Sequence, residues 1–188
     1  MKIVQELELD SVYLVGNSMG GYISWELAVR KPEIVKKLVL VNSAGYEMDK
    51  VGGVFIQLSR TKLFKKLFSK GIPFPITKRA AINSLFIRPT NIELEAFHEL
   101  LNRKETIRTL NKLGSSKQLA DVSRIKLINI PTLIIWGKED KVISVEHAYS
   151  FDQDIGNSSL KIYEDIGHVP MLECAEKFSN DLLAFLVQ

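Results

Sequence analysis

Val12-Tyr13-Leu14-Val15-Gly16-Asn17-Ser18-Met19-Gly20-Gly21 is the stretch of sequence that decides the fold. A short apolar run leads directly to a serine that has glycines two positions before and after it. The apolar run predicts a buried strand, and the residues after the serine predict the start of a helix. A sharp turn between strand and helix exposes the serine hydroxyl, so Ser18 is a candidate nucleophile.

The glycines around Ser18 fit such a turn, because its serine has a positive φ angle and the strand and helix approach closely. We expect Gly16 and Gly20 to provide the room, and Gly21 to let the helix lie close to the sheet. The G-x-S-x-G pattern alone is weak, but a strand before it and a helix after it make it specific. The structural alternative is a plain Gly-Ser turn at a strand–helix junction.

The composition is that of an ordinary globular protein: 188 residues, 46% apolar and 25% charged, enough for one domain with a sizeable core. A net charge of +3 is too small to indicate nucleic-acid binding. No apolar run has the length of a membrane span, and residues 1–8 do not form a secretory signal. A single cysteine, Cys174, favours a reducing compartment and a packed apolar role. We therefore expect a cytoplasmic protein.

Strand and helix patterns alternate at both ends of the chain. A strand, a helix and a strand near 12–15, 19–30 and 37–41 have the spacing of a βαβ unit, so the strands should be parallel. Alternation resumes with a strand at 132–136, a helix from Ser144 to about 154, a strand at 160–163 and an amphipathic helix at 174–187. The chain therefore predicts an α/β fold with four parallel strands and flanking helices.

Between these two parts, residues 46–120 show no such alternation. A helical pattern covers 54–69, Gly71-Ile72-Pro73-Phe74-Pro75 interrupts it, and a second helix runs from a Thr90-x-x-Glu93 capping box towards residue 112. We interpret 46–120 as a helical insertion into a core made of 1–45 and 121–188. Segment 45–79 carries eight Lys and Arg residues against two acids. It is either a surface that makes weak contact with lipid or a helix with solvated lysines.

A serine nucleophile needs a base, and the chain has three histidines. His98 lies on the apolar side of the 90–112 helix, which indicates packing or a lid. His147 lies early in a polar helix, where we expect it to be solvated. His168 follows Gly167 in a loop just beyond a strand, and such loops at the carboxyl ends of parallel strands carry the chemistry of these sheets. His168 is therefore the predicted base.

The imidazole in turn needs a carboxylate, which fixes its tautomer and stabilises its charged form. Asp140 follows the strand 132–136 in the same kind of loop, with Glu139 beside it. Asp165 is the other candidate, but it lies too near His168 in sequence to face the ring easily. We expect Asp140 to be the acid.

These motifs together resemble the α/β-hydrolase fold superfamily. The matching stretches are residues 14–21, 130–140 and 167–170 with Glu173, and the resemblance runs over residues 1–188. It implies a triad of Ser18, Asp140 and His168, in the chain order of that family. It also implies that the insertion is the family's cap and that the backbone N–H of Met19 is one half of the oxyanion hole. The implied chemistry requires no metal and no organic cofactor.

The nucleophile and its neighbours narrow the reaction. Haloalkane dehalogenases and epoxide hydrolases resemble this chain but use Asp where it has Ser18. An Asn directly before the serine, here Asn17, resembles the motif of two groups of enzymes. These are the C–C hydrolases of meta-cleavage products, and carboxylesterases and lipases. The C–C hydrolases usually have Trp directly after the catalytic His, where this chain has Val169. We therefore expect hydrolysis of a small-molecule ester, with C–C hydrolysis as the alternative.

The strand before Ser18 should be central in this family, with further strands ahead of it and a loop that supplies the second oxyanion donor. No such strand or loop precedes 12–15. We therefore expect a C-terminal portion of an α/β-hydrolase, in which 12–15 is an unpaired apolar edge. Such an edge predicts association with a second copy, and an inactive fragment is the alternative to a working enzyme.

Overall fold

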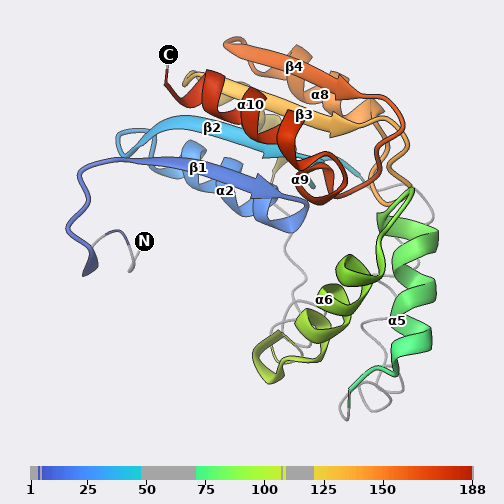
Figure 1. Cartoon of the computed structure of the whole chain (residues 1–188). Coiled ribbons are helices and arrows are strands. Elements are labelled where there is room, and N and C mark those ends of the chain that lie inside the picture. The colour runs from blue at the N-terminus through green and yellow to red at the C-terminus, as the bar shows by residue number, and fades with distance from the viewer. Residues whose placement is uncertain (1–3, 5, 48–70, 107, 109–120, 188) are drawn as a thin grey trace.

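The computed structural model describes residues 4, 6–47, 71–106, 108 and 121–187 (Figure 1). Its centre is a sheet of four strands in the order β1-β2-β3-β4. The strands are β1 (Val12–Asn17), β2 (Val35–Val41), β3 (Thr132–Gly137) and β4 (Ser158–Tyr163). All three pairings are parallel, so the expected α/β fold is confirmed. Each strand is longer than its apolar run, because the ladder continues into neighbouring residues such as Asn17 and Ser158.

Helices cover both faces of this sheet. The helices α2 (Met19–Arg30), η2 (Val122–Leu127, a 3-10 helix) and α8 (Glu146–Asp154) pack on one face. The opposite face packs against α9 (Pro170–Glu173) and α10 (Ala175–Leu186). Figure 1 shows α10 crossing in front of the sheet and α2 behind it. None of the helices in the described ranges is long and apolar enough to cross a bilayer.

The layers follow from the alternation of side chains along each strand. Leu38 and Leu40 of β2 enter the core under α2, while Val39 and Val41 enter the core under α10. All six residues of β3 are buried. A strand covered on both faces needs apolar side chains in nearly every position, which explains the continuous run of β3.

The strand β1 lies at one edge of the sheet and is covered less completely. Among the described residues it pairs with β2 alone. Tyr13 is 49% exposed and Val15 is 46% exposed. Val15 pairs with Val39, so both point to the face that α10 covers, yet the core under α10 includes no residue of β1. The apolar edge expected from the sequence is therefore present in the described sheet.

The described part of the insertion lies apart from the sheet in Figure 1. It consists of α5 (Phe74–Ala80), the π-helical turn η1 (Ala81–Leu85) and α6 (Asn91–Asn102). These elements contribute to a small apolar cluster centred on the buried side chains of Ala81, Phe86 and Leu94, against which Val169, directly after His168, also packs. The expected capping box at Thr90 and Glu93 is present.

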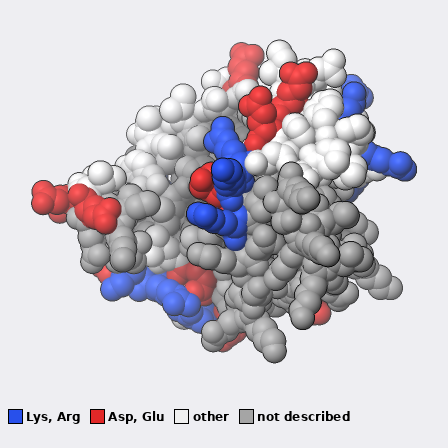
Figure 2. Space-filling view, turned by 90° about the horizontal axis from the view of Figure 1, so that it is seen from below, with Lys and Arg blue, Asp and Glu red and all other residues white. Residues whose placement is uncertain are grey.

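The described part of the insertion differs from the expected helices at the end of α6. The helix α6 ends at Asn102, where Arg103 leaves the helical region with a ψ angle of 135°, but residues 104–106 and 108 are helical again. Residues 109–112 of the expected helix lie outside the described residues. The helix expected over 54–69 and most of the basic segment 45–79 lie outside the described residues. On the face shown in Figure 2, described Lys and Arg side chains form several separate groups, with Asp and Glu side chains near them.

Candidate active site

Ser18 forms the turn between β1 and α2. Its φ angle is 54° and its ψ angle is −119°, so the expected positive φ is confirmed. The Ser18 N–H donates to the Val41 carbonyl at 3.0 Å, and the Ser18 carbonyl accepts from the Ala44 N–H at 2.9 Å. Both bonds connect the turn to the end of β2. They fix the backbone of Ser18 in a conformation that serine rarely adopts.

The glycines around Ser18 differ in what they do. A Cβ on Gly16 would clash with the backbone of Gly20, and a Cβ on Gly21 would clash with Ser43. A Cβ on Gly20 would meet no heavy atom within 4 Å. The expectation that Gly20 itself needs room is therefore wrong. The close contact is between the backbone of Gly20 and the place that a Cβ on Gly16 would occupy. Gly16 is therefore the residue that must lack a side chain in this contact.

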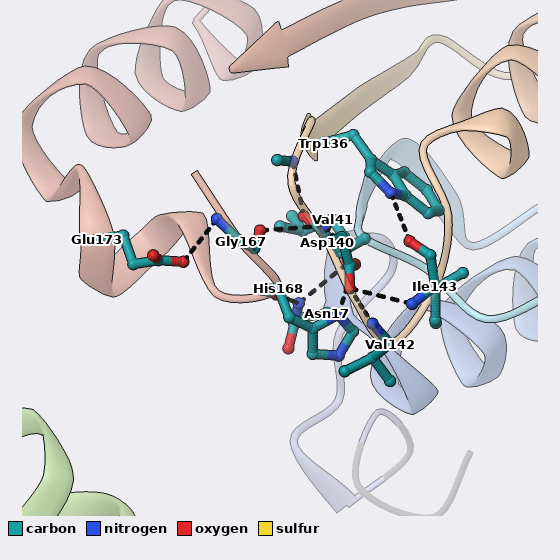
Figure 3. A network of polar contacts seen from close by, with 11 residues as sticks. Asn17, Val41, Trp136, Asp140, Val142, Ile143, Gly167, His168 and Glu173 are labelled. Atoms are coloured by element: carbon teal, nitrogen blue, oxygen red, sulfur yellow. Dashed lines mark hydrogen bonds and ion pairs between the residues drawn. The ribbon is translucent and has the colours of Figure 1, made fainter. Parts of the chain in front are cut away.

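The structure brings Asp140 and His168 together, from the loops after β3 and β4 (Figure 3). His168 Nδ1 lies 2.7 Å from Asp140 Oδ2, with the ring N–H as donor. The Asp140 side chain is fully buried, and the His168 side chain is 5% exposed. The other oxygen, Asp140 Oδ1, accepts from the N–H groups of Val142 at 2.7 Å and Ile143 at 3.0 Å. The carboxylate is thus fixed by the backbone on one side and faces the imidazole on the other.

The other candidates for acid and base lie elsewhere. Asp165 is exposed in the turn after β4. His98 packs inside the insertion, 2.9 Å from Thr77 Oγ1, with its ring 5.2 Å from that of Phe74. The expectation that His147 is solvated is wrong, because it is only 7% exposed.

The burial of His147 comes from a contact that its own helix does not reveal. Its ring lies edge-on to Tyr46, with the centroids 5.8 Å apart. Tyr46 follows β2 and also donates a hydrogen bond to Asp154 at 3.0 Å. Burial is the main cause that raises the pKa of Tyr46, and this hydrogen bond raises it further. The residues after β2 therefore cover the start of α8.

Asn17 links the serine turn to the histidine loop. Its side-chain amide donates to the Val41 carbonyl at 3.1 Å and to the His168 carbonyl at 3.0 Å. Within the described ranges, no hydrogen bond joins the Ser18 hydroxyl to the His168 ring. Since Asp140 binds Nδ1, the other ring nitrogen, Nε2, is the atom available to a serine hydroxyl.

Asn42, directly after β2, is a site residue that the sequence analysis missed. Its side chain donates to Asp140 Oδ2 at 2.6 Å and accepts from the Gly137 N–H at 3.3 Å. The signal was available in principle, since a polar residue at the carboxyl end of a buried parallel strand lies where these sheets place chemistry.

Glu173 connects the histidine loop to the insertion. Its two carboxylate oxygens accept from the N–H groups of Gly167 at 2.9 Å and Ile87 at 2.7 Å. The backbone N–H of His168 donates to the Leu85 carbonyl at 2.8 Å. A Cβ on Gly167 would lie 2.7 Å from that carbonyl oxygen, so this contact requires glycine. The position of His168 therefore depends on the segment that leaves η1.

Two further expectations concern the surroundings. Met19 is the first residue of α2, where backbone N–H groups have no partner inside the helix and the helix dipole favours negative charge. Cys174 donates to the Pro170 carbonyl at 3.3 Å, and burial raises the pKa of its thiol, as suits a packed side chain. No cluster of His, Cys, Asp and Glu that could hold a metal occurs in the part of the chain that the structure describes.

Comparison with known proteins gives consistent matches. The family model of the alpha/beta hydrolase fold matches residues 2–175. A 2-hydroxy-6-oxo-6-(2'-aminophenyl)hexa-2,4-dienoic acid hydrolase of Metapseudomonas resinovorans is 34% identical, over 93% of this chain and 59% of that protein. Lipase 3 of Moraxella sp. (strain TA144) is 30% identical, over 93% of this chain and 56% of that protein.

A solved thermophilic esterase of Thermogutta terrifontis superimposes with a TM-score of 0.81, over 98% of this chain and 68% of that chain. Its identity of 17% makes this a likeness of fold alone. Several of the similar curated proteins are named as hydrolases of 2-hydroxy-6-oxo dienoates or dienedioates, the meta-cleavage type. The chain spans 66% or less of the length of such relatives, including one of Klebsiella pneumoniae at 29% identity.

Proposed function

Because the chain belongs to the α/β-hydrolase fold family, we propose that it carries the active site of a serine hydrolase. Ser18 is the nucleophile, His168 is the base and Asp140 is the acid that orients it. The backbone N–H of Met19 is one oxyanion donor. The observation that carries this assignment is the 2.7 Å hydrogen bond between the buried Asp140 and His168, at the sheet end where Ser18 has its positive φ angle.

The chemistry follows from these positions. His168 Nε2 removes the hydroxyl proton as Ser18 attacks a carbonyl carbon, and the imidazolium is stabilised by Asp140. The negative charge on the carbonyl oxygen is stabilised by the Met19 N–H at the start of α2. His168 then donates its proton to the leaving group and activates the water that releases the acyl-enzyme. This chain's own residues supply each proton transfer.

The first substrate class is a 2-hydroxy-6-oxo dienoate, which would be hydrolysed at a carbon–carbon bond. The support is the 34% identity to a hydrolase named for such a substrate. Its leaving group is a conjugated carbon rather than an alkoxide, so a proton from His168 must reach carbon. This order differs from the one expected from the sequence, where the ester came first.

Carboxylic esters are the second class. They are supported by the 30% identity to Lipase 3 of Moraxella and by Val169, which stands where C–C hydrolases usually have Trp. An alkoxide leaving group needs only a proton on oxygen, which His168 can supply directly.

The two classes are separated by turnover of the purified chain. We expect loss of the dienoate absorbance of 2-hydroxy-6-oxo-6-phenylhexa-2,4-dienoate to be faster, relative to the uncatalysed rate, than release of p-nitrophenol from short esters. Ser18→Ala should abolish both activities, whereas Ser150→Ala, at a partly exposed serine of α8, should leave both unchanged. Ester turnover without dienoate turnover would reverse the order of the two classes. Full activity in Ser18→Ala would contradict the assignment of the nucleophile.

A further inference from the structure

An uncharged polar side chain is fully buried beside the acid–base pair. Asn42 is 0% exposed and follows β2 directly. Its φ angle is 43°, in the left-handed region that Asn adopts more readily than most residues. Burying an amide costs free energy unless its donor and acceptor atoms have partners. The partners of Asn42 therefore indicate what the residue does.

Those partners belong to the acid–base pair or to the strand end and the loop that carry it. Nδ2 donates to Asp140 Oδ2 at 2.6 Å and lies 3.4 Å from the Gly167 carbonyl oxygen. Oδ1 accepts from the Gly137 N–H at 3.3 Å. Gly137 ends β3, and Gly167 directly precedes His168. One amide therefore connects the ends of β2 and β3 with the histidine loop.

The Asp140 carboxylate receives donors on both oxygens. Oδ1 accepts from the backbone at Val142 and Ile143. Oδ2 accepts from Asn42 at 2.6 Å and from His168 at 2.7 Å. Without Asn42, the imidazole would be the one remaining hydrogen-bond donor to Oδ2 in the described part of the chain. The carboxylate could then turn about its backbone-held oxygen and carry the imidazole with it.

We propose that Asn42 is a positioning residue, which holds Asp140 Oδ2 in line with His168 Nδ1 and so orients the base towards Ser18. The proposal rests on the proposed function, because it assigns a task within the same site. Asn42 acts through Asp140 and does not contact the reacting atoms. Its amide is suited to the task because it donates to the carboxylate without adding a charge to a buried site.

Two variants separate positioning from simple packing. Asn42→Gly removes the amide and tolerates the φ angle of 43°. Asn42→Asp keeps the size of the side chain but replaces the donor with a second carboxyl group beside Asp140. The matched control is Asn157→Gly, an exposed residue in the turn before β4.

The first measurement is the proton NMR signal of the hydrogen between His168 Nδ1 and Asp140, which a short charge-assisted hydrogen bond shifts far downfield. The wild type and Asn157→Gly should both show it. In Asn42→Gly the signal should move upfield or disappear, while circular dichroism and cooperative unfolding show a folded chain. Labelling of Ser18 by a fluorophosphonate should slow by roughly 10- to 100-fold, as when the supporting partner of an active-site group is lost.

The second measurement is the pH dependence of labelling in Asn42→Asp. Two carboxyl groups at this distance repel each other when both are ionised, so they share one proton until the pH is well above the usual carboxyl range. The protonated group can donate in place of the amide, and Asp140 and His168 are the titratable groups in direct contact. The ratio of variant to wild-type labelling rates should therefore fall as pH rises. For Asn42→Gly, the same ratio should stay flat.

The outcomes distinguish this proposal from the proposed function. A folded Asn42→Gly chain with the wild-type NMR signal and labelling rate would overturn the positioning role. If the wild type is not labelled, yet Asn42→Gly loses the signal, the proposed function fails for this chain and the positioning role stands. If Asn42→Gly does not fold, the decision passes to Asn42→Asp, where a ratio that is flat with pH would overturn the proposal.

Discussion

The proposed nucleophile and the proposed acid–base pair stand on parts of the sheet that are supported very differently. Asp140 follows β3, whose residues are all buried, and its side chain has no exposed surface. Ser18 follows β1, an edge of the described sheet where Tyr13 and Val15 are about half exposed. The proposed acid is thus held by contacts inside the described core, whereas the proposed nucleophile depends on one strand neighbour and on the turn itself.

This difference assigns separate tasks to the two regions. The pair of Asp140 and His168 is organised by hydrogen bonds from Asn42, Val142 and Ile143, with lengths of 2.6, 2.7 and 3.0 Å. The serine turn is organised by backbone contact of β1 with α2 and by its bonds to the end of β2. Changes on the base side should therefore affect chemistry most, and changes on the β1 side should affect stability and association.

The largest effect is expected on the base side. Asp140→Asn should slow fluorophosphonate labelling by roughly a thousandfold to ten-thousandfold, because a neutral amide neither fixes the tautomer of His168 nor stabilises its charge. Asp165→Asn, in the exposed turn before the same histidine, is the control and should label at the wild-type rate. Equal losses in both variants would contradict the distinction between the two carboxylates.

The next largest effects are expected at two glycines of the serine turn. Alanine at these two positions should change the free energy of unfolding in opposite directions. Gly16→Ala should lower the free energy of unfolding by about 1–3 kcal/mol, because its Cβ would clash with the backbone of Gly20. Gly20→Ala should raise it by up to about 1 kcal/mol, because the position is helical and its Cβ meets no atom within 4 Å. Urea unfolding measures both. Destabilisation by Gly20→Ala as large as that by Gly16→Ala would show that the close contact is assigned to the wrong residue.

A smaller effect, on stability at low pH, is expected at β4. This strand is the other edge of the described sheet, and unlike β1 it is covered by α10. Burial acts to raise the pKa of Asp181 in α10, but hydrogen bonds from Lys161, Tyr163 and Lys177 lower it to about 2 from the usual 3.8. A lowered pKa means that this contribution to stability is complete above pH 3.8 and is lost as pH falls towards 2. The melting temperature of the wild type should therefore fall more steeply than that of Asp181→Asn across this window. Parallel curves would contradict the assignment.

The smallest effect concerns the exposed edge of β1, through which we propose that a second copy associates. Val15→Lys should weaken concentration-dependent self-association in sedimentation, because a charge on an edge strand opposes pairing. The matched control is Ile92→Lys, on an apolar side chain of α6 that is 79% exposed. A wild type that is monomeric at every concentration would rule out this association.

The sheet could be predicted because its information is local. Apolar runs such as 132–136 and the turn at Ser18 are read from neighbouring residues, and the loops after the strands then fall at one end of a parallel sheet. Asp140 and His168 could be proposed for the same reason, since each follows a strand directly.

The features that could not be predicted depend on contacts between residues that are far apart in the sequence. Asn42 and Asp140 are 98 positions apart, and nothing in the turn after β2 indicates which carboxylate its amide will meet. The burial of His147 depends on Tyr46, which comes from the same turn. The expectation for Gly20 was wrong because the motif shows only which glycines lie near the close contact. It does not show which residue contributes the backbone and which would contribute the clashing Cβ.

The proposed triad is tested most directly by the site of fluorophosphonate modification, mapped by mass spectrometry on the wild type, Ser18→Ala and His168→Gln. We expect one adduct per chain on the peptide that contains Ser18, none in Ser18→Ala, and a greatly slowed reaction in His168→Gln. An adduct on another residue, or labelling of His168→Gln at the wild-type rate, would contradict the claim that the buried pair of Asp140 and His168 serves Ser18.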